Sequence, residues 1–154
     1  MSLPDLGCAC ANLRRAARLV TQLYSDSMGG TLEPAQYSLL SALHRAPGLS
    51  QTQLGRVLGL DKTTLSRNFK VLQKNGWVEV VPAARDKRAR GYGLTKDGRE
   101  IHEAALPGWA TAQDRLRTAL PDGEWERLFD VLNRVTSAAV ALNSVPHGST
   151  HTAP

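Results

Sequence analysis

The residues with the most distinctive chemistry lie on one face of a helix that the sequence predicts between Asp61 and Asn75. At about 100° per residue, the residues within roughly 40° of the polar pole are Thr63, Arg67, Lys70 and Lys74, and Thr64 and Ser66 flank that pole. Lys62, in the first turn of the helix, is a further candidate contact. Arginine can donate two hydrogen bonds to guanine, hydroxyls can meet base edges or phosphates, and lysine suits phosphate. This pattern is typical of a helix that enters the major groove of DNA. An ordinary amphipathic surface helix is the alternative interpretation.

A second group of cations follows, between two predicted strands at Trp77–Val81 and Gly91–Leu94. The candidate DNA-binding residues of this loop are Arg85, Asp86, Lys87, Arg88 and Arg90. A basic hairpin tip that directly follows a helix-turn-helix is a wing, and its arginines can enter the minor groove, where negative potential is concentrated. Asp86 is expected to accept a hydrogen bond from Arg88 or from the backbone and so to set the shape of the loop. A solvated surface turn is the alternative.

Capping residues predict the two helices that must position these groups. Ser50 and Gln53 fit a capping box that begins a short helix, and Gly59 ends that helix. Asp61 then caps the longer helix, which Gly76 stops. A short helix, a tight joint and a longer helix describe a helix-turn-helix. With a preceding helix that begins at Pro34, the winged helix-turn-helix part covers residues 34–94.

Residues 8–30 and 95–142 are expected to form helices on either side of this part. Apolar residues recur at helical spacing up to the Gly29-Gly30 pair, and Thr95 caps a later helix. Pro107-Gly108 predicts a kink or break in that helix. A last helix begins at Pro121-Asp122 and carries a continuous apolar side. Residues 143–154 read as a disordered tail.

The charge of the chain is concentrated in its middle. The net charge is +2 over residues 1–60, +5 over residues 61–100 and −2 over residues 101–154. A basic middle between nearly neutral ends favours a polyanionic partner. The 154 residues are enough for one domain, residues 1–154 as a single unit, and no apolar stretch reaches the roughly 20 residues of a membrane span.

The sequence offers no support for an enzyme. The motifs of serine hydrolases, zinc proteases, P-loop proteins and dinucleotide-binding proteins are absent, as is a spaced Cys/His quartet. No cofactor and no structural metal are therefore expected. Two cysteines cannot make a disulfide scaffold, so a reducing cytoplasm is the expected compartment.

Three segments of the chain resemble the MarR family of winged helix-turn-helix regulators. They read LSQTQLGRVLGLDKTTLSRNFKVLQKNGWVEV, RDKRARGYGLTKDGRE and LRRAARLVTQLY, and the resemblance extends over roughly Cys10 to Val140. Its most specific parts are Asn75–Glu79, Asp86–Arg88, and Leu94-Thr95 followed by Gly98.

The resemblance implies a mostly α (α+β) fold with a small hairpin wing, and a homodimer in which the first and the last two helices interlock. It also implies repression of transcription at a palindromic operator, relieved by a small molecule or an oxidant. The recognition helix would be Asp61–Asn75, and Arg88, braced by Asp86, would be the wing arginine that enters the groove. A winged-helix module that binds proteins and does not read DNA is the alternative function.

The resemblance also suggests where a small molecule would bind. Many members of this family bind aromatic acids or phenols in a crevice between the dimer helices and the winged domain. In this sequence the crevice would lie near Tyr37, His44 and Trp109. The alternatives are an ordinary surface or helix-end role for His44 and a place in the dimer core for Trp109.

Cys10 is the second candidate sensor. The segment from Cys10 to Tyr24 is similar to the start of the organic-peroxide-sensing branch, whose reactive cysteine is hydrogen-bonded by a tyrosine that matches Tyr24. The other helper tyrosine of that branch falls on Arg14, which on a helix would stabilise a Cys10 thiolate from four residues away. Cys8 would be a resolving thiol, or both thiols would bind a soft metal ion with ligands from the other subunit. Two inert residues near a frayed terminus are the remaining alternative.

Overall fold

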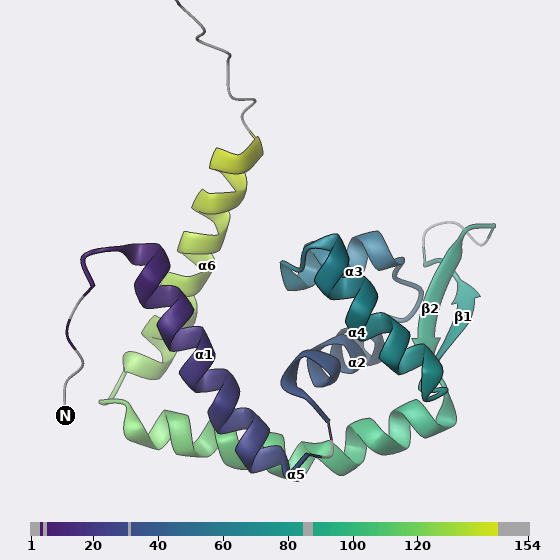
Figure 1. Cartoon of the computed structure of the whole chain (residues 1–154), viewed down its shortest axis with the longest axis horizontal. Coiled ribbons are helices and arrows are strands. Elements are labelled where there is room, and N and C mark those ends of the chain that lie inside the picture. The colour runs from purple at the N-terminus through teal and green to yellow at the C-terminus, as the bar shows by residue number, and fades with distance from the viewer. Residues whose placement is uncertain (1–3, 5, 31, 85–87, 145–154) are drawn as a thin grey trace, which may run out of the picture. The chain divides into compact units, whose positions relative to one another are not determined.

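The computed structural model of the chain describes residues 4, 6–30, 32–84 and 88–144. These residues form helices and one antiparallel hairpin (Figure 1), as the sequence predicts for a mostly α fold. The elements are α1 (Ala9–Met28), α2 (Pro34–Arg45), α3 (Gln51–Leu58), α4 (Lys62–Lys74), β1 (Val78–Pro82), β2 (Arg90–Leu94), α5 (Lys96–Ala119) and α6 (Glu124–Ser144). The chain divides into two compact units, Met1–Gln113 and Asp114–Pro154. Among the described residues, no helix is both long and apolar enough to cross a membrane.

The predicted helix-turn-helix is confirmed, together with the caps that define it. The Gln53 amide donates to Ser50 Oγ over 3.3 Å, and the Ser50 amide donates to Gln53 Oε1 over 2.8 Å. Gly59 ends α3 in the left-handed conformation at φ 63°. Asp61 Oδ1 then accepts the amides of Thr63 and Thr64, each at 2.9 Å, and begins α4. The joint between the helices is therefore fixed by short-range hydrogen bonds that the sequence makes visible.

The core of the first unit decides which way α4 faces. Leu65, Phe69 and Leu72 are buried against apolar side chains of α2 and α3. Phe69 is completely buried and meets the ring of Tyr92 edge to face, with the ring centroids 4.6 Å apart. Because one side of α4 is held in this core, its opposite side must face outward.

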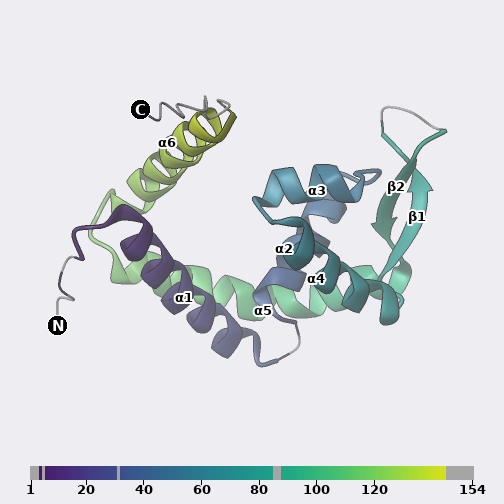
Figure 2. The same ribbon diagram turned by 45° about the horizontal axis from the view of Figure 1, so that its top comes forward.

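The hairpin is attached to the helix-turn-helix through the loop before α3. The Gly48 amide donates to the Tyr92 carbonyl over 2.8 Å, and the Tyr92 amide donates to the Leu49 carbonyl over 3.0 Å. The Ala84 amide also donates to the Gly48 carbonyl over 3.2 Å. Figure 2 shows the two strands beside α4. This attachment joins residues far apart in the sequence and was not predicted from it.

Two glycines make this close approach of backbones feasible. Gly48 has φ +88°, and a Cβ on Gly91 would overlap the Gly48 carbonyl. The strands pair in the register Val78↔Leu94 and Pro82↔Arg90. Arg90 therefore belongs to β2 and not to the loop in which the sequence places it.

Helix α5 continues through Pro107, so of the predicted kink or break, the break is wrong and the kink stays a prediction. Pro107 and Glu103, four residues earlier, are both exposed, and water can reach the carbonyl that loses its amide partner. Gly108 serves a packing role, because a Cβ there would lie 2.6 Å from the Ser27 carbonyl oxygen at the end of α1. The missing side chain of Gly108 therefore allows the end of α1 to approach α5 closely.

Helix α6, in the second unit, presents an apolar face that no described residue buries. Its exposed apolar side chains include Val131, Leu132, Val135 and Leu142, which lie within about 100° of one another around the helix. The helix begins at Glu124, slightly later than predicted from Pro121. It also includes Asn143 and Ser144, which the sequence placed in the tail, and residues 145–154 lie outside the described part.

Gly98 shows why the sequence places a glycine in the first turn of α5. The amide of Gly98 donates to Thr95 Oγ1 over 3.0 Å, and the Thr95 hydroxyl donates to the Gly76 carbonyl over 2.7 Å. A Cβ on Gly98 would overlap the carbonyl of Trp77. The end of α4, the start of β1 and the start of α5 meet here with no room for a side chain.

We predict that Gly98→Ala lowers the free energy of unfolding by about 1–3 kcal/mol, because the added methyl group forces backbone apart. This direction is opposite to that of intrinsic helix propensity, which favours alanine by about 1 kcal/mol. Urea unfolding followed by circular dichroism measures the change. Asp97→Ala, an exposed position on the same turn, should shift stability by less than about 1 kcal/mol. A Gly98→Ala protein as stable as the wild type would contradict the packing described here.

Candidate nucleic-acid interface

The outer face of α4 carries the polar side chains that the sequence predicts there. Lys62, Thr63, Arg67, Lys70 and Lys74 are exposed, whereas Thr64 and Ser66 are half-buried. The buried side of the helix is apolar over its whole length. The division of α4 into a core face and a cationic face is therefore as predicted.

The two threonines at the start of α4 differ in what their hydroxyls do. The Thr64 hydroxyl donates to Asp61 Oδ2 over 2.6 Å, so it supports the cap. Hydrogen bonds from the Thr64 hydroxyl and from the Thr64 and Thr63 amides hold the pKa of Asp61 below its ordinary value. Thr63, by contrast, is exposed on the cationic face. Of the two, Thr63 is the better placed to meet a nucleic acid.

The wing brings further cations to the same unit. Arg88 and Arg90 are exposed, and Arg90 lies opposite Pro82 in the hairpin. The other predicted wing residues, Arg85, Asp86 and Lys87, lie outside the described residues, as does the predicted support of Arg88 by Asp86. Helix α4 contacts β1 directly, so the two basic elements belong to the same compact unit.

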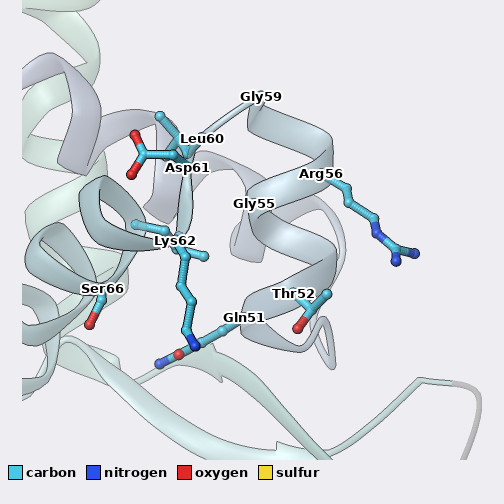
Figure 3. A pocket seen from close by; sticks show the side chains of 10 residues that line it. Gln51, Thr52, Gly55, Arg56, Gly59, Leu60, Asp61, Lys62 and Ser66 are labelled. Atoms are coloured by element: carbon cyan, nitrogen blue, oxygen red, sulfur yellow. The ribbon is translucent and has the colours of Figure 1, made fainter. Parts of the chain in front are cut away.

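A groove of about 520 Å³ lies between α3 and the start of α4 (Figure 3). Leu60, Leu65 and Gly55 contribute apolar surface to it, and Gln51 and Thr52 contribute polar groups from the first turn of α3. The Lys62 side chain extends along the groove toward Gln51, while Arg56 points away from α4. In the sequence, the start of α3 is recognisable only by its capping box, and no local pattern reveals that this turn places polar groups beside the cationic face.

A second cavity, of about 440 Å³, lies against α2 in the first unit. Tyr37 and Trp109 line it as predicted, and their rings stack with centroids 5.9 Å apart. Ser41 and Arg45 add a hydroxyl and a cation. His44 does not line this cavity and is exposed. The structure thus brings together two of the three predicted crevice residues.

Burial raises the pKa of Tyr37 above its ordinary value, and this effect outweighs a hydrogen bond with Ser41 and the nearby Arg45 charge, which both lower it. The phenol is therefore neutral at physiological pH. Tyr24 behaves in the same way: burial is the main cause of its raised pKa, with a smaller contribution from Tyr37.

The thiols lie at the start of α1. Cys8 is the N-cap residue, Cys10 is in the first turn, and both are exposed and free of disulfides. Arg14 is one turn further along the same helix and is exposed. Among the described residues, no cluster of three or more His, Cys, Asp or Glu side chains could hold a metal ion.

Within one chain, Tyr24 cannot form the predicted hydrogen bond with Cys10, so that contact stays a prediction for two copies. At 1.5 Å per residue, the two positions on α1 are roughly 21 Å apart. The Tyr24 hydroxyl instead donates to Gln113 Oε1 on α5. Only a second copy of the chain can bring a Tyr24 side chain to Cys10.

Comparisons with known proteins agree with this arrangement. A model of the MarR family matches residues 31–89. The structure of the transcriptional regulator MosR from M. tuberculosis in complex with DNA is similar, with 31% identity, a TM-score of 0.75, and coverage of 88% of this chain and 98% of MosR. PcaV from Streptomyces coelicolor, in complex with its natural ligand, has 28% identity and a TM-score of 0.74 over 90% of this chain and 99% of PcaV.

A further relative, the transcriptional regulator PetP from Rhodobacter capsulatus, is 39% identical over 74 residues. That match covers 46% of this chain and 45% of PetP, so it spans less than half of the relative. The MosR and PcaV matches, by contrast, extend over nearly the whole of those chains. The helix-turn-helix, the hairpin wing and these similarities together place the chain in the MarR family of winged helix-turn-helix transcriptional regulators.

Proposed function

We propose that this regulator binds double-stranded DNA as a homodimer in the cytoplasm, and represses transcription from a palindromic operator. Helix α4 enters the major groove and the wing enters the adjacent minor groove. The observation that carries this proposal is the exposed row of Thr63, Arg67, Lys70 and Lys74, held outward by the buried side of α4. The complexes of MosR and CouR with DNA support it by similarity.

The same placement implies that the protein also contacts the sugar-phosphate backbone that separates the major groove from the adjacent minor groove. If α4 lies in one groove and the wing in the next, this backbone must cross the surface between them. The first turn of α3 occupies that surface, with Gln51 and Thr52 at the groove along which Lys62 lies. These groups suit phosphate oxygens, which position a protein on DNA without reading its sequence.

The homodimer is supported by the apolar face of α6. Side chains of this size at helical spacing are normally covered in a folded protein, and a contiguous exposed patch marks an interaction site. A second copy offers the same face, and it would present two reading surfaces to the two halves of a palindrome, about one helical turn apart.

The central test is the loss of DNA affinity when single arginines are removed. Arg67→Ala should cost about 1–3 kcal/mol, which is roughly 5- to 150-fold in affinity, and should relax the sequence preference at one base pair. Arg88→Ala should cost a similar amount through the minor groove. Lys70→Ala should weaken all sequences alike and reduce the slope of log affinity against log salt by about 1. Fluorescence anisotropy with upstream promoter DNA at several salt concentrations measures all three.

Arg134→Ala on α6 is the control, since this exposed arginine pairs with Asp130 and belongs to the second unit, outside the proposed DNA contacts. Its affinity for DNA should stay within about twofold of the wild type. If neither the wild type nor the variants shift any duplex at low and moderate salt, the chain is a protein-interaction module. If Arg67→Ala and Arg88→Ala bind as tightly as the wild type, the assignment of the reading surface is wrong.

We further propose that a small aromatic acid or phenol relieves repression by binding in the cavity of Tyr37, Ser41, Arg45 and Trp109. The two stacked rings offer an apolar slot, and Arg45 and Ser41 offer a cation and a hydroxyl for an acidic group. The ligand bound to PcaV supports this by similarity. Arg45→Ala should lower the affinity for benzoate at least tenfold if the carboxylate pairs with the guanidinium.

Relief of repression by an oxidant at Cys10 is the second candidate for the signal. It is favoured by the exposure of Cys10 and by Arg14 one turn away. The hydrogen-bonding tyrosine would have to come from the second copy. A Cys10→Ser protein that releases DNA on treatment with an organic hydroperoxide as readily as the wild type would exclude this route.

A further inference from the structure

His102 is a buried polar side chain of the described chain to which DNA binding assigns no role. Its side chain lies on α5, and the residue is only 6% exposed. Its Nε2 lies 3.0 Å from Ser41 Oγ on α2. Its Nδ1 is buried and has no hydrogen-bond partner among the described residues.

The His102 ring is part of a stack that joins two helices. Tyr37 lies on it with the centroids 5.0 Å apart and the planes at 12°, and His44 lies on it at 5.1 Å and 25°. Trp109 extends the stack by contacting Tyr37. The four rings come alternately from α5 and α2, in the order Trp109, Tyr37, His102 and His44. The stack therefore interleaves the two helices, and His102 occupies an inner position.

We propose that His102 is a proton-binding site, which holds α2 against α5 while it is neutral and loosens that contact when it binds a proton, so that mild acid weakens DNA binding. The proposal rests on the DNA-binding function above and adds a regulatory input to it. Neither the crevice ligand nor Cys10 is needed for this input.

Protonation is unfavourable in this position for reasons of geometry. A second ring proton would create an N–H group at Nδ1 with no described acceptor, and it would place a charge in a site that excludes water. From α2, His44 and Arg45 face the ring and oppose a positive charge, whereas Glu103 on α5 favours it. Burial is the largest influence, and the net effect lowers the pKa of His102 below its ordinary value of 6.5.

The direction of the pH effect follows from this. Well above pH 6.5 the imidazole is neutral both in the stack and in an opened form, and the stack is fully stable. As the pH falls below 6.5, the opened form binds a proton that the closed stack resists, so opening becomes more favourable by up to tenfold per pH unit for each protomer. The effect ends once the pH falls below the lowered pKa of the closed form.

Opening matters for DNA because α2 supports the reading surface. Helix α2 contacts α3, α4 and β2. When its ring contacts with α5 are lost, the helix-turn-helix and hairpin lose a fixed attachment to the long helix. A regulator whose reading surfaces must match two half-sites would then bind less tightly.

The test combines a titration with DNA binding on the full-length protein. Proton–carbon NMR of the histidine Cε1–H groups, with His102→Gln to assign the signal, should give a midpoint for His102 below 6.5. Anisotropy with operator DNA between pH 8.0 and 5.5 should show the affinity of the wild type falling below pH 6.5, by up to tenfold per pH unit for each protomer of the dimer. His102→Phe keeps a ring in the stack but cannot bind a proton, so its affinity should match the wild type at pH 8.0 and change less than about threefold across the range.

His44→Gln removes the outer ring of the stack and a group that opposes a charge on His102, but it keeps His102 itself. A pH dependence should therefore remain, with the midpoint of His102 raised. A His102 midpoint at or above 6.5, or a His102→Phe or His102→Gln protein with the pH dependence of the wild type, would overturn the proposal. A wild type that fails to bind DNA at pH 8.0 would instead contradict the proposed function. The two failures are therefore distinguishable.

Discussion

Replacing Leu132 with Asp should convert the protein to monomers and lower its affinity for a two-half-site operator by at least about a hundredfold. Leu132 lies within the exposed apolar face of α6, and no side chain of this helix is buried within the chain. A carboxylate in a dimer interface loses its hydration and has no partner, which costs several kcal/mol. The monomer keeps this position in water, so the fold of each copy should be unaffected.

The fall in DNA affinity follows from the loss of the second reading surface. In a dimer, binding of one half-site holds the other reading surface near the second half-site at high effective concentration, and this gain reaches about 10²–10⁴. Sedimentation equilibrium gives the oligomeric state, and anisotropy gives the affinity. Binding to a single half-site should change little.

Ser137→Asp is the matched control, because it adds the same charge to α6 at an exposed position about 140° around the helix from Leu132. It should leave the dimer and operator binding close to the wild type. If Leu132→Asp remains dimeric and binds the operator normally, the apolar face of α6 is not part of the interface.

Phe69→Ala should lower the free energy of unfolding by about 3–5 kcal/mol. The ring is completely buried and packs edge to face on Tyr92, so its removal leaves a cavity where α4 meets the hairpin. A domain of this size is stable by only about 5–15 kcal/mol in total. Urea unfolding should show the loss directly.

The same substitution also bears on function, since Phe69 lies between Arg67 and Lys70 along α4. A looser core lets the outer face rotate, so DNA affinity should fall even where the protein remains folded. Val57→Ala, at a position that is 65% exposed, should change stability by less than about 1 kcal/mol. Equal stability of the Phe69→Ala protein and the wild type would contradict the burial of this ring.

The helix-turn-helix could be predicted because its determinants are local. The Ser50–Gln53 box, the Asp61 cap and the spacing of Leu65, Phe69 and Leu72 lie within a few residues of the structure that they form. The cationic face of α4 follows from the same periodicity. In each case the residues that determine an element are close in sequence to that element.

The features that could not be predicted depend on contacts between distant segments. The sequence does not reveal that the loop at Gly48 bonds to Tyr92, since both groups are backbone. The ring stack between α2 and α5 could not be predicted, because Ser41 and His102, which meet there, are 61 residues apart in the sequence. The break expected at Pro107 fails because its cost depends on exposure. The sequence also does not show that a Tyr24–Cys10 contact needs a second copy, which follows from the unbroken helix α1 between the two residues.

The attachment of the hairpin to the loop at Gly48 has a consequence for how a signal can act. Since backbone hydrogen bonds hold the wing to the helix-turn-helix, we expect the wing and the recognition helix of one protomer to move together. An inducer therefore changes little in how the reading surface of each protomer fits its own half-site. It must instead change the distance or the angle between the two reading surfaces of the dimer. Operators with an altered spacer length, but with every contacted base kept, are therefore the ones for which the induced and the uninduced protein should differ least in affinity.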